Sequence, residues 1–441
     1  MSGFITTIRN IYKIEDLRFR IIFTLGLILI YRVGSFVVLP GMDPQALDNV
    51  DGTGGIFGLI NMFSGGAFSR ASIFALGIMP YISASIIVQL LGMTVPFFQK
   101  LQKEGESGRR KINQITRYLT VVITAAQASA YVAYLRNTFG DAIVIESASF
   151  FWFTTLIILT AGTMFIVWVG EKITDKGIGN GISIIIMVGI IAGLPFGLSA
   201  EFASRLNEGG GAVPLLIELA LLAGIITAVI MLVQGTRRIP VQYAKRVVGN
   251  KMYGGVRQYI PFKVNAAGVM PIIFAQAIMF VPKLFQGAFP NSSFLLAYNN
   301  FGGWTYNITI ALMVIIFTYF YTAILYNPVQ MADEMKRSGA FIPGVKPGRK
   351  TSEYLDSVMS RITFPGSLFL AFVTILPAFA INLGVNSQFA IFYGGTSLLI
   401  LVGVVLDTLQ QIESHLLMRH YDGLMKTGRI KGRSSTLGQP A

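Results

Sequence analysis

The sequence carries one short motif twice, first as Met79-Pro80-Tyr81-Ile82-Ser83-Ala84 and again as Met270-Pro271-Ile272-Ile273-Phe274-Ala275. Four of the six residues match. A second pair of stretches, residues 181–186 and 395–400, matches more loosely. Each motif and its copy lie five apolar stretches apart, so the second half of the chain would cross a membrane in the opposite direction. The pattern predicts two inverted halves, with chance similarity among apolar helices as the alternative.

Ten apolar stretches run through the chain, each close to the roughly 20 residues that a helix needs to cross about 30 Å of hydrocarbon. Hydrophobic residues make up 53% of the sequence and charged residues only 13%, which excludes a soluble globular core. We expect an all-α polytopic membrane protein, with ten transmembrane helices in two inverted five-helix halves around a central pore. The expected spans are 21–40, 71–96, 118–135, 150–170, 181–200, 212–234, 264–285, 305–327, 365–384 and 389–411.

The basic residues predict the orientation of these spans. With a cytoplasmic N-terminus, the cytoplasmic segments hold 30 of the 35 Lys and Arg residues. The positive-inside rule therefore places both termini in the cytoplasm of a multi-pass protein. Residues 1–20 are basic, and no small-residue cleavage site follows the first apolar run, so we expect a retained helix rather than a signal peptide.

The spans divide the chain into segments with separate expected roles. These are a cytoplasmic N-terminal segment 1–20, an N-terminal half 21–200, an outer loop with span six 201–234, a basic cytoplasmic loop 235–263, spans seven and eight 264–327, a cytoplasmic docking loop 328–364, spans nine and ten 365–411, and a cytoplasmic tail 412–441.

Residues suited to catalysis or metal binding are scarce. The sequence has no cysteine, and its two histidines, His415 and His420, lie at the end of the last span and in the tail without a metal-ligand motif. We therefore expect no enzyme activity, no metal and no cofactor. Among charged residues only Arg32 lies well inside a span. An ion-coupled transporter of a small solute usually needs a charge near the midplane, so it is the less favoured alternative, together with a docking protein that transports nothing.

Two cytoplasmic loops exceed what orientation alone requires. The loop 235–263 has seven basic residues, interleaved with tyrosines, and no acidic residue occurs between Glu218 and Asp333. This mixture suits contacts with RNA phosphates or an acidic protein, and attraction to anionic lipid is the alternative. The loop 327–365 contains glycines and prolines that predict an exposed tip between two short helices.

Several longer motifs run through both halves of the chain. They are Asn61-Met62-Phe63-Ser64-Gly65-Gly66-Ala67-Phe68-Ser69-Arg70-Ala71-Ser72, Gly77-Ile78-Met79-Pro80-Tyr81-Ile82-Ser83-Ala84-Ser85, Glu104-Gly105-Glu106-Ser107-Gly108-Arg109-Arg110-Lys111, Gly177-Ile178-Gly179-Asn180-Gly181-Ile182-Ser183, Lys263-Val264-Asn265, Ser338-Gly339-Ala340-Phe341 and Gly394-Gly395-Thr396-Ser397. Over about residues 5–430 the chain closely resembles the bacterial SecY family.

The resemblance implies the channel subunit of the general secretory translocase in the bacterial cytoplasmic membrane. Such a channel passes unfolded polypeptides and releases apolar segments sideways into lipid. The nearly charge-free spans agree with this function. A polypeptide offers no single side chain to recognise, so its conduit needs no specific polar site. The family's apolar pore ring carries over to Ile78, Ile82, Ile182, Ile186, Ile273 and Ile400. Packed aliphatic side chains exclude water and ions. Without the resemblance, each isoleucine would be expected to face lipid or a neighbouring helix.

Residues 55–72 are too short to span and resemble the family's plug helix, with glycines that permit sharp turns at both ends. A helix on the outer membrane surface is the alternative. The plug residues by resemblance are Ile56, Phe57, Leu59, Ile60, Met62, Phe63, Gly65 and Gly66. The lateral-gate positions are Gln89, Gln127 and Asn265, whose amides form only weak bonds across a seam in a membrane.

The resemblance also implies partners. They are the motor ATPase SecA, the ribosome, the small subunits SecE and SecG, signal sequences, nascent or unfolded polypeptides, and membrane lipids. The docking residues for SecA and the ribosome are Arg237, Arg238, Lys245, Arg246, Lys251, Arg257, Lys346, Arg349 and Lys350. Bacterial relatives usually have arginine where this chain has Lys346, and lysine keeps the charge but loses the planar two-pronged donor.

Overall fold

The computed structural model describes residues 14–47, 61–145, 147–207, 211–243, 246–248, 251–253, 257–284 and 303–427. Four of the predicted plug residues, Ile56, Phe57, Leu59 and Ile60, therefore lie outside the described residues. So does the docking residue Lys245, and for Arg246 and Lys251 only the backbone is described.

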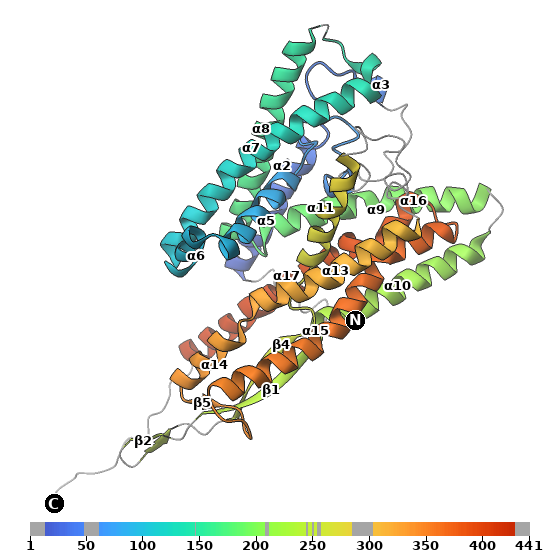
Figure 1. Ribbon diagram of the computed structural model, residues 1–441. Coiled ribbons are helices and arrows are strands. Elements are labelled where there is room, and N and C mark those ends of the chain that lie inside the picture. Colours follow the sequence, from blue (N-terminus) through green and yellow to red (C-terminus); the bar gives the residue numbers. More distant parts are fainter. Residues whose placement is uncertain are drawn as a thin grey trace, which may run out of the picture.

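The described part of the first half of the chain, up to Asn207, is mainly helical (Figure 1). Three long helices, α7, α8 and α9, form most of it, and the short α5 and α6 pack on α7. The elements are α2 (Glu15–Gly34), α3 (Pro44–Leu47), α5 (Met79–Thr94), α6 (Pro96–Lys103), α7 (Glu106–Thr138), η1 (Gly140–Ala142), α8 (Ala148–Lys176) and α9 (Gly181–Asn207).

The second half repeats this arrangement and adds the strands. Within it, α13 packs on α11 and α15, and α17 packs on α10 and α15. The helical elements are α10 (Ala212–Gln234), α11 (Met270–Leu284), α13 (Trp304–Leu325), α14 (Pro328–Arg337), α15 (Arg349–Asn382), α16 (Ser387–Ala390), η3 (Ile391–Tyr393) and α17 (Gly395–Thr427). The strands are β1 (Thr236–Tyr243), β2 (Arg246–Val248), β3 (Lys251–Tyr253), β4 (Arg257–Lys263) and β5 (Ala340–Phe341).

A helix lies at each of the ten predicted spans, and the protein is a multi-pass membrane protein. Of the helices in the described residues, seven are by themselves long and apolar enough to cross a membrane. The helix α2 is not among the seven because it contains several charged residues, and α11 is not among them because it has only 15 residues. The second span differs from the prediction, because α5 begins only at Met79 and α6 continues from it at a bend of 96°. Pro96, which starts α6, disfavours helix at the preceding residue, and Val95 is extended.

The expected α-helical membrane fold is confirmed, and the basic loop 235–263 adds strands to it. Antiparallel strands β1 and β4 pair from Thr236 with Lys263 to Gln242 with Arg257, and β5 adds to the other edge of β1. In β1 the side chains of Ile239 and Val241 are buried, while Arg238 and Pro240 are exposed. This alternation is the period of a half-buried strand, and the buried side packs against α14 and α15.

The loop 327–365 also differs from the prediction of two short helices. It contains α14 and then an exposed tip, but the second helix, α15, continues without interruption from Arg349 to Asn382. The predicted boundary at residue 365 therefore lies inside a helix. Pro365 lacks a donor for the helix ladder, yet packing of α15 against α13 and α17 maintains the helix across it.

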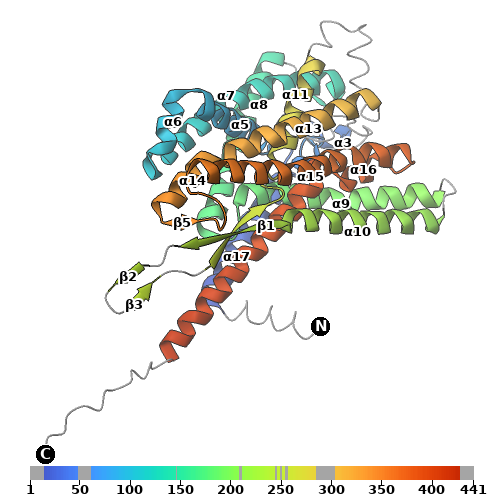
Figure 2. The same ribbon diagram turned by 60° about the horizontal axis from the view of Figure 1, so that its bottom comes forward.

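The two halves meet mainly along α9, which packs against α10, α16 and α17 of the second half (Figures 1 and 2). All four motif copies found in the sequence begin helices: α5 and α11 start at Met79 and Met270, and α9 and α17 start at Gly181 and Gly395. The repeated motifs are therefore similar in structure as well as in sequence. They bring the first turns of four helices toward the interface between the halves.

Candidate functional site: an apolar cavity between the two halves

A cavity of about 520 Å³ lies between the two halves. Its walls come from α5 and α9 of the first half, from α10, α11 and α17 of the second, and from the end of β4 with the connection 264–269 that precedes α11. Five of the six predicted pore-ring residues line it: Ile82, Ile182, Ile186, Ile273 and Ile400. The structure thus brings together isoleucines that are more than 300 residues apart in the sequence.

Each isoleucine lies in the first two turns of its helix, so the helix starts determine where these side chains point. On α9, Asn180 caps the helix, because its side-chain oxygen accepts the N–H groups of Ile182 (3.1 Å) and Ser183 (3.3 Å). The hydroxyl of Thr174 accepts the N–H of Gly181 at 2.9 Å. The four-residue spacing then puts Ile182 and Ile186 on one face of α9.

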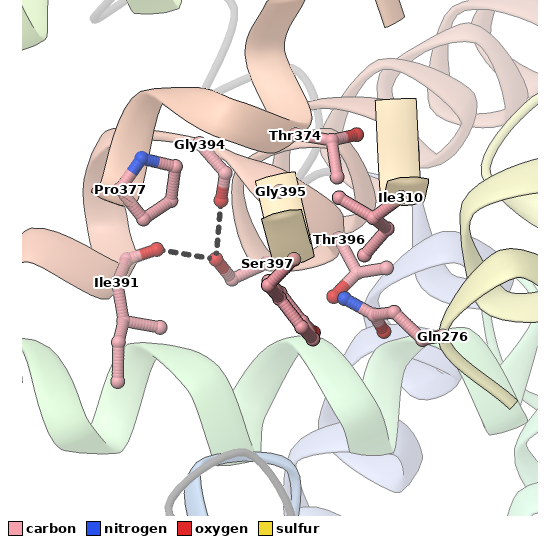
Figure 3. Close-up of a pocket in the computed structure, with 10 residues that line it drawn as sticks. Gln276, Ile310, Thr374, Pro377, Ile391, Gly394, Gly395, Thr396 and Ser397 are labelled. Carbon is pink, nitrogen blue, oxygen red and sulfur yellow. Dashed lines mark hydrogen bonds between the residues drawn. The ribbon is translucent and has the colours of Figure 1, made fainter. Parts of the chain in front are cut away.

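The start of α17 is stabilised by the hydroxyl of Ser397 rather than by an asparagine cap (Figure 3). The hydroxyl of Ser397 lies 2.8 Å from the carbonyl oxygen of Ile391 and 3.0 Å from that of Gly394. A small cavity of about 20 Å³ adjoins this turn, and its lining includes Gln276 and Thr374. These hydrogen bonds stabilise the turn between η3 and α17. They therefore position the first turns of α17, which carry Ile400.

Ile78, the sixth predicted ring residue, does not line the cavity. It is buried in a hydrophobic cluster that also contains Ile186 and Ile400, together with Met62 and Phe63 of the predicted plug. Ile82 and Ile182 pack against the same cluster. Ile186 and Ile400 therefore belong both to the lining of the cavity and to the cluster that contains the described part of the predicted plug.

The described part of the predicted plug, residues 61–72, is mostly turns rather than helix. Only residues 61–63 are helical. Gly65 and Gly66 have φ angles of 65° and 84°, a region that favours glycine. Asn61 braces the turn, because its backbone carbonyl accepts the N–H of Gly66 at 2.8 Å and its side chain accepts that of Ser69 at 2.9 Å.

The turn packs directly on α9 at Gly189. A Cβ atom built on Gly189 would lie 2.4 Å from the carbonyl oxygen of Phe63 and 3.3 Å from the nitrogen of Gly65. These are backbone atoms, so a flexible side chain cannot yield to make room. The absence of a side chain at Gly189 is what allows the segment to approach α9, which lines the cavity.

The three predicted gate amides are not hydrogen-bonded to one another in the described part of the chain. Gln89 on α5 and Gln127 on α7 are half-buried and do not line the cavity. Asn265 does line it, and its side-chain oxygen is buried without a hydrogen-bond partner. Residues of both α5 and α11 line the cavity.

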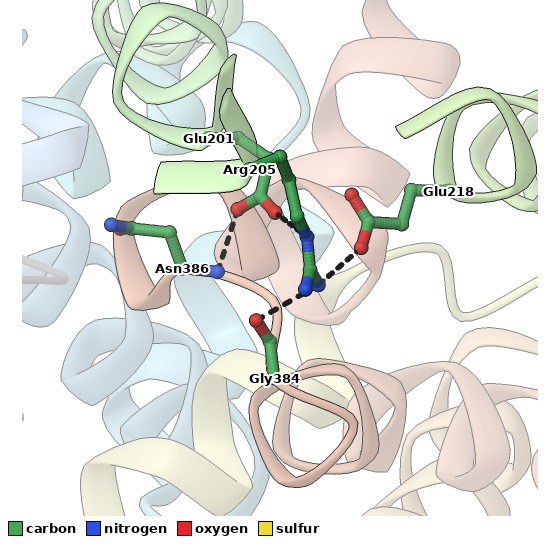
Figure 4. A network of polar contacts seen from close by, with 5 residues as sticks. All are labelled: Glu201, Arg205, Glu218, Gly384 and Asn386. Carbon is green, nitrogen blue, oxygen red and sulfur yellow. Dashed lines mark hydrogen bonds and ion pairs between the residues drawn. The ribbon is translucent and has the colours of Figure 1, made fainter. Parts of the chain in front are cut away.

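Sequence analysis missed a buried ion cluster that joins the halves far from the gate amides (Figure 4). Arg205 of α9 donates to Glu201 at 2.9 Å, to Glu218 of α10, and to the carbonyl of Gly384 at 2.9 Å. Glu201 is fully buried and accepts the N–H of Asn386 at 2.6 Å. The four-residue spacing of Glu201 and Arg205 could have predicted an ion pair on one face of a helix. The other groups of the cluster come from elements that only the fold brings close.

The predicted docking residues that are described gather at one end of the molecule, where β1, β4, β5 and α14 lie (Figure 1). We call this end the basic face. Arg237, Arg238 and Arg257 are exposed on the sheet, and Lys346 is exposed at the tip. Arg349 and Lys350 both pair with Glu353, at 3.2 and 2.8 Å, so part of the positive charge at the tip is neutralised.

Comparison with known proteins gives consistent results. The family model of SecY matches residues 72–409. The protein translocase subunit SecY of Halalkalibacterium halodurans is 47% identical over 95% of this chain and 99% of its own length. That of Streptomyces scabiei is 42% identical over 96% of this chain and its entire length.

Solved structures share the fold at lower identity. One described as a protein-conducting channel has a TM-score of 0.62 at 16% identity and covers 94% of this chain and 95% of its own. A structure concerned with the plug domain of the SecY protein, in which the plug is said to stabilise the closed state, has a TM-score of 0.57 at 17% identity with the same coverage. Sec61 in a canine ribosome–channel complex has a TM-score of 0.56 at 16% identity, also with the same coverage.

Proposed function

Because the chain belongs to the SecY family and is a protein-conducting translocation channel, we propose that the cavity between its halves is the conduit. In this proposal the six isoleucines Ile78, Ile82, Ile182, Ile186, Ile273 and Ile400 form the constriction, and residues 55–72 close it from the side opposite the cavity. The observation that carries the proposal is that five of these side chains, from four separate helices, line one cavity.

The chemistry of the constriction fits a polypeptide substrate. Translocating chains present side chains of every size and charge, so a specific polar site would bind some of them too tightly to release. An aliphatic ring packs shut when the channel is empty and parts around side chains without leaving a buried charge unpaired. Contact of Met62 and Phe63 with the cluster of Ile78, Ile186 and Ile400 supports a second seal on the far side.

A transporter coupled to an ion is less well supported by the same cavity. Its charged lining residues are Lys263, at the end of β4, and Asp407, about two turns beyond Ile400 in α17. Neither lies among the isoleucines, where an ion-coupling charge would be expected near the midplane. We infer that apolar segments leave sideways between α5 and α11, where Asn265 faces the cavity and the gate amides lack mutual bonds.

We further propose that the basic face is cytoplasmic and docks the partners that supply polypeptide. Exposed arginines on β1 and β4 and the tip at Lys346 would meet ribosomal RNA or the acidic surface of a motor ATPase such as SecA. Related channels, Sec61 and yeast Ssh1, have been solved bound to ribosomes. SecE and SecG are the proposed small subunits, and the bacterial cytoplasmic membrane is the proposed location.

Reconstitution tests the proposal. Vesicles that contain this chain with SecE should import a secretory precursor into a protease-protected space when SecA and ATP are added. Vesicles with SecE alone are the control. A variant with Ile186→Ser and Ile400→Ser should still import but should leak ions at rest, because water would enter the loosened ring. Absence of import by the unmodified chain, or an ion-tight double variant, would contradict the proposal.

A further inference from the structure

Two arginines from different segments bind the same backbone carbonyl. Nη1 of Arg32, in the last turn of α2, donates to the carbonyl oxygen of Gly65 at 3.1 Å. Nη2 of Arg70 donates to the same oxygen at 2.9 Å. The phenol of Tyr31 lies 3.4 Å from the neighbouring carbonyl of Ser64. The turn of the proposed plug is therefore bound to the end of α2.

Both guanidinium groups also lie over one aromatic ring. The central carbons of Arg32 and Arg70 are 5.3 and 4.3 Å from the ring centre of Phe36, within the range of a cation–π contact. Among the described residues neither arginine has a carboxylate within 4 Å, and Nε of Arg70 is buried without an acceptor. Two like charges are thus held together without a counter-ion, an arrangement that costs free energy and calls for a function.

The backbone conformation at this point favours glycine. A Cβ atom on Gly65 would lie 2.5 Å from Nη1 of Arg32, and the φ angle of 65° disfavours any other residue type. The carbonyl that both arginines bind is therefore presented by a conformation that glycine supplies.

We propose that Arg32 and Arg70 form a latch that holds the plug turn in its resting position, so that both are positioning residues for channel closure. Arg32 and Phe36 belong to the fixed side, at the end of α2. Gly65 and Arg70 belong to the segment that would move. Two arginine contacts cross between the sides, Arg32 with the Gly65 carbonyl and Arg70 with the Phe36 ring, beside the contact of the Tyr31 phenol with the Ser64 carbonyl. The proposal rests on the proposed sealing role of residues 55–72.

Loss of one arginine leaves the other crossing contact in place. Hydrogen bonds from charged donors are stronger than neutral ones, so we expect Arg32→Gln or Arg70→Gln to raise the open fraction of the resting channel about tenfold. Each single change also relieves the repulsion between the two cations, which limits its effect. The double variant loses both contacts but gains the relief of repulsion only once, so its effect should exceed the product of the two single effects.

The experiment measures resting ion conductance of the purified full-length chain in planar bilayers. Arg136→Gln is the matched control, because Arg136 is an exposed arginine in the last turn of α7. Arg32→Lys retains the charge and a donor, so its leak should be much smaller than that of Arg32→Gln. If Arg32 acted through packing alone, the lysine and glutamine variants would leak equally. Leak equal to that of the unmodified chain in both Gln variants, or equal leak from Arg136→Gln, would overturn the latch.

Failure of the latch can be told from failure of the proposed function. If the serine variants of Ile186 and Ile400 leak while the arginine variants remain closed, the channel assignment stands and the latch is wrong. If neither set leaks, the seal itself is wrong and the latch falls with it. Leak from Arg32→Gln that lysine does not reduce would assign these residues to packing, which also overturns the proposal.

Discussion

Substitution of Gly189 by alanine perturbs the proposed plug without changing the sequence of the plug itself. The new Cβ atom would lie 2.4 Å from the Phe63 carbonyl oxygen, whereas ordinary contacts begin at 3.4 Å. The segment and α9 must therefore separate by about 1.0 Å, the difference between those distances. Because the colliding atoms are backbone, the strain is expected to displace the plug turn as a unit.

The size of the effect follows from the cost of overpacking, which is typically about 1–3 kcal/mol. Applied to the closed state alone, that cost raises the ratio of open to closed channels about 5- to 150-fold. Alanine also favours helix over glycine by about 1 kcal/mol, but α9 is expected to be helical in both states, so this gain cancels from the ratio.

Gly193→Ala is the matched control for Gly189→Ala. It lies one turn further along α9, and its Cβ atom would meet a neighbouring atom only at an ordinary 3.6 Å. Both variants are reconstituted in planar bilayers and their resting conductance is compared at equal protein density. We expect Gly189→Ala to leak and Gly193→Ala to remain closed. Equal conductance of the two variants would refute the reasoning that the plug turn seals by packing on Gly189.

Three further predictions concern the ion cluster, the cavity and the basic face. Arg205→Gln leaves two buried carboxylates without their cation, so it should destabilise the fold by about 3–5 kcal/mol and lower the thermal unfolding temperature in detergent; an unchanged temperature would contradict this. Asn265→Leu removes a buried oxygen that lacks a partner, so thermal stability should rise, by about 1–3 kcal/mol if the whole penalty is recovered; a loss of stability would show that the oxygen is bonded. Arg237→Glu with Arg238→Glu should weaken ribosome or SecA binding at low salt and reduce its salt dependence, whereas Lys176→Glu, on α8, should not; equal effects would limit these charges to setting orientation.

The repeat-related helices could be predicted because their signal lies in consecutive residues. Met79 and Met270, and likewise Gly181 and Gly395, each start a helix, so the sequence motif marked both the helix and its inverted partner. Placement of the isoleucines required the family resemblance as well, since periodicity does not tell a pore-facing isoleucine from a lipid-facing one.

Other features depended on contacts that no local pattern encodes. The clash at Gly189 arises from a plug turn more than 100 residues away, and the partners of Arg205 come from α10 and from the connection between α15 and α16. The sheet on the basic face was different, because the alternation of Arg238, Ile239, Pro240 and Val241 was visible. The basic charge of the loop carries no such information, because charge alone does not distinguish a strand from an irregular loop.

The central claim is that polypeptide passes between the halves through the isoleucine ring. The most direct measurement arrests a translocating precursor in reconstituted vesicles and tests its crosslinking to single cysteines introduced into this cysteine-free chain. Cysteine at Ile186 or Ile400 should crosslink to the arrested precursor, whereas cysteine at Leu216, exposed on the outside of α10, should not. Crosslinks at Leu216 with none at Ile186 or Ile400 would contradict the account, because the polypeptide would then pass outside the cavity.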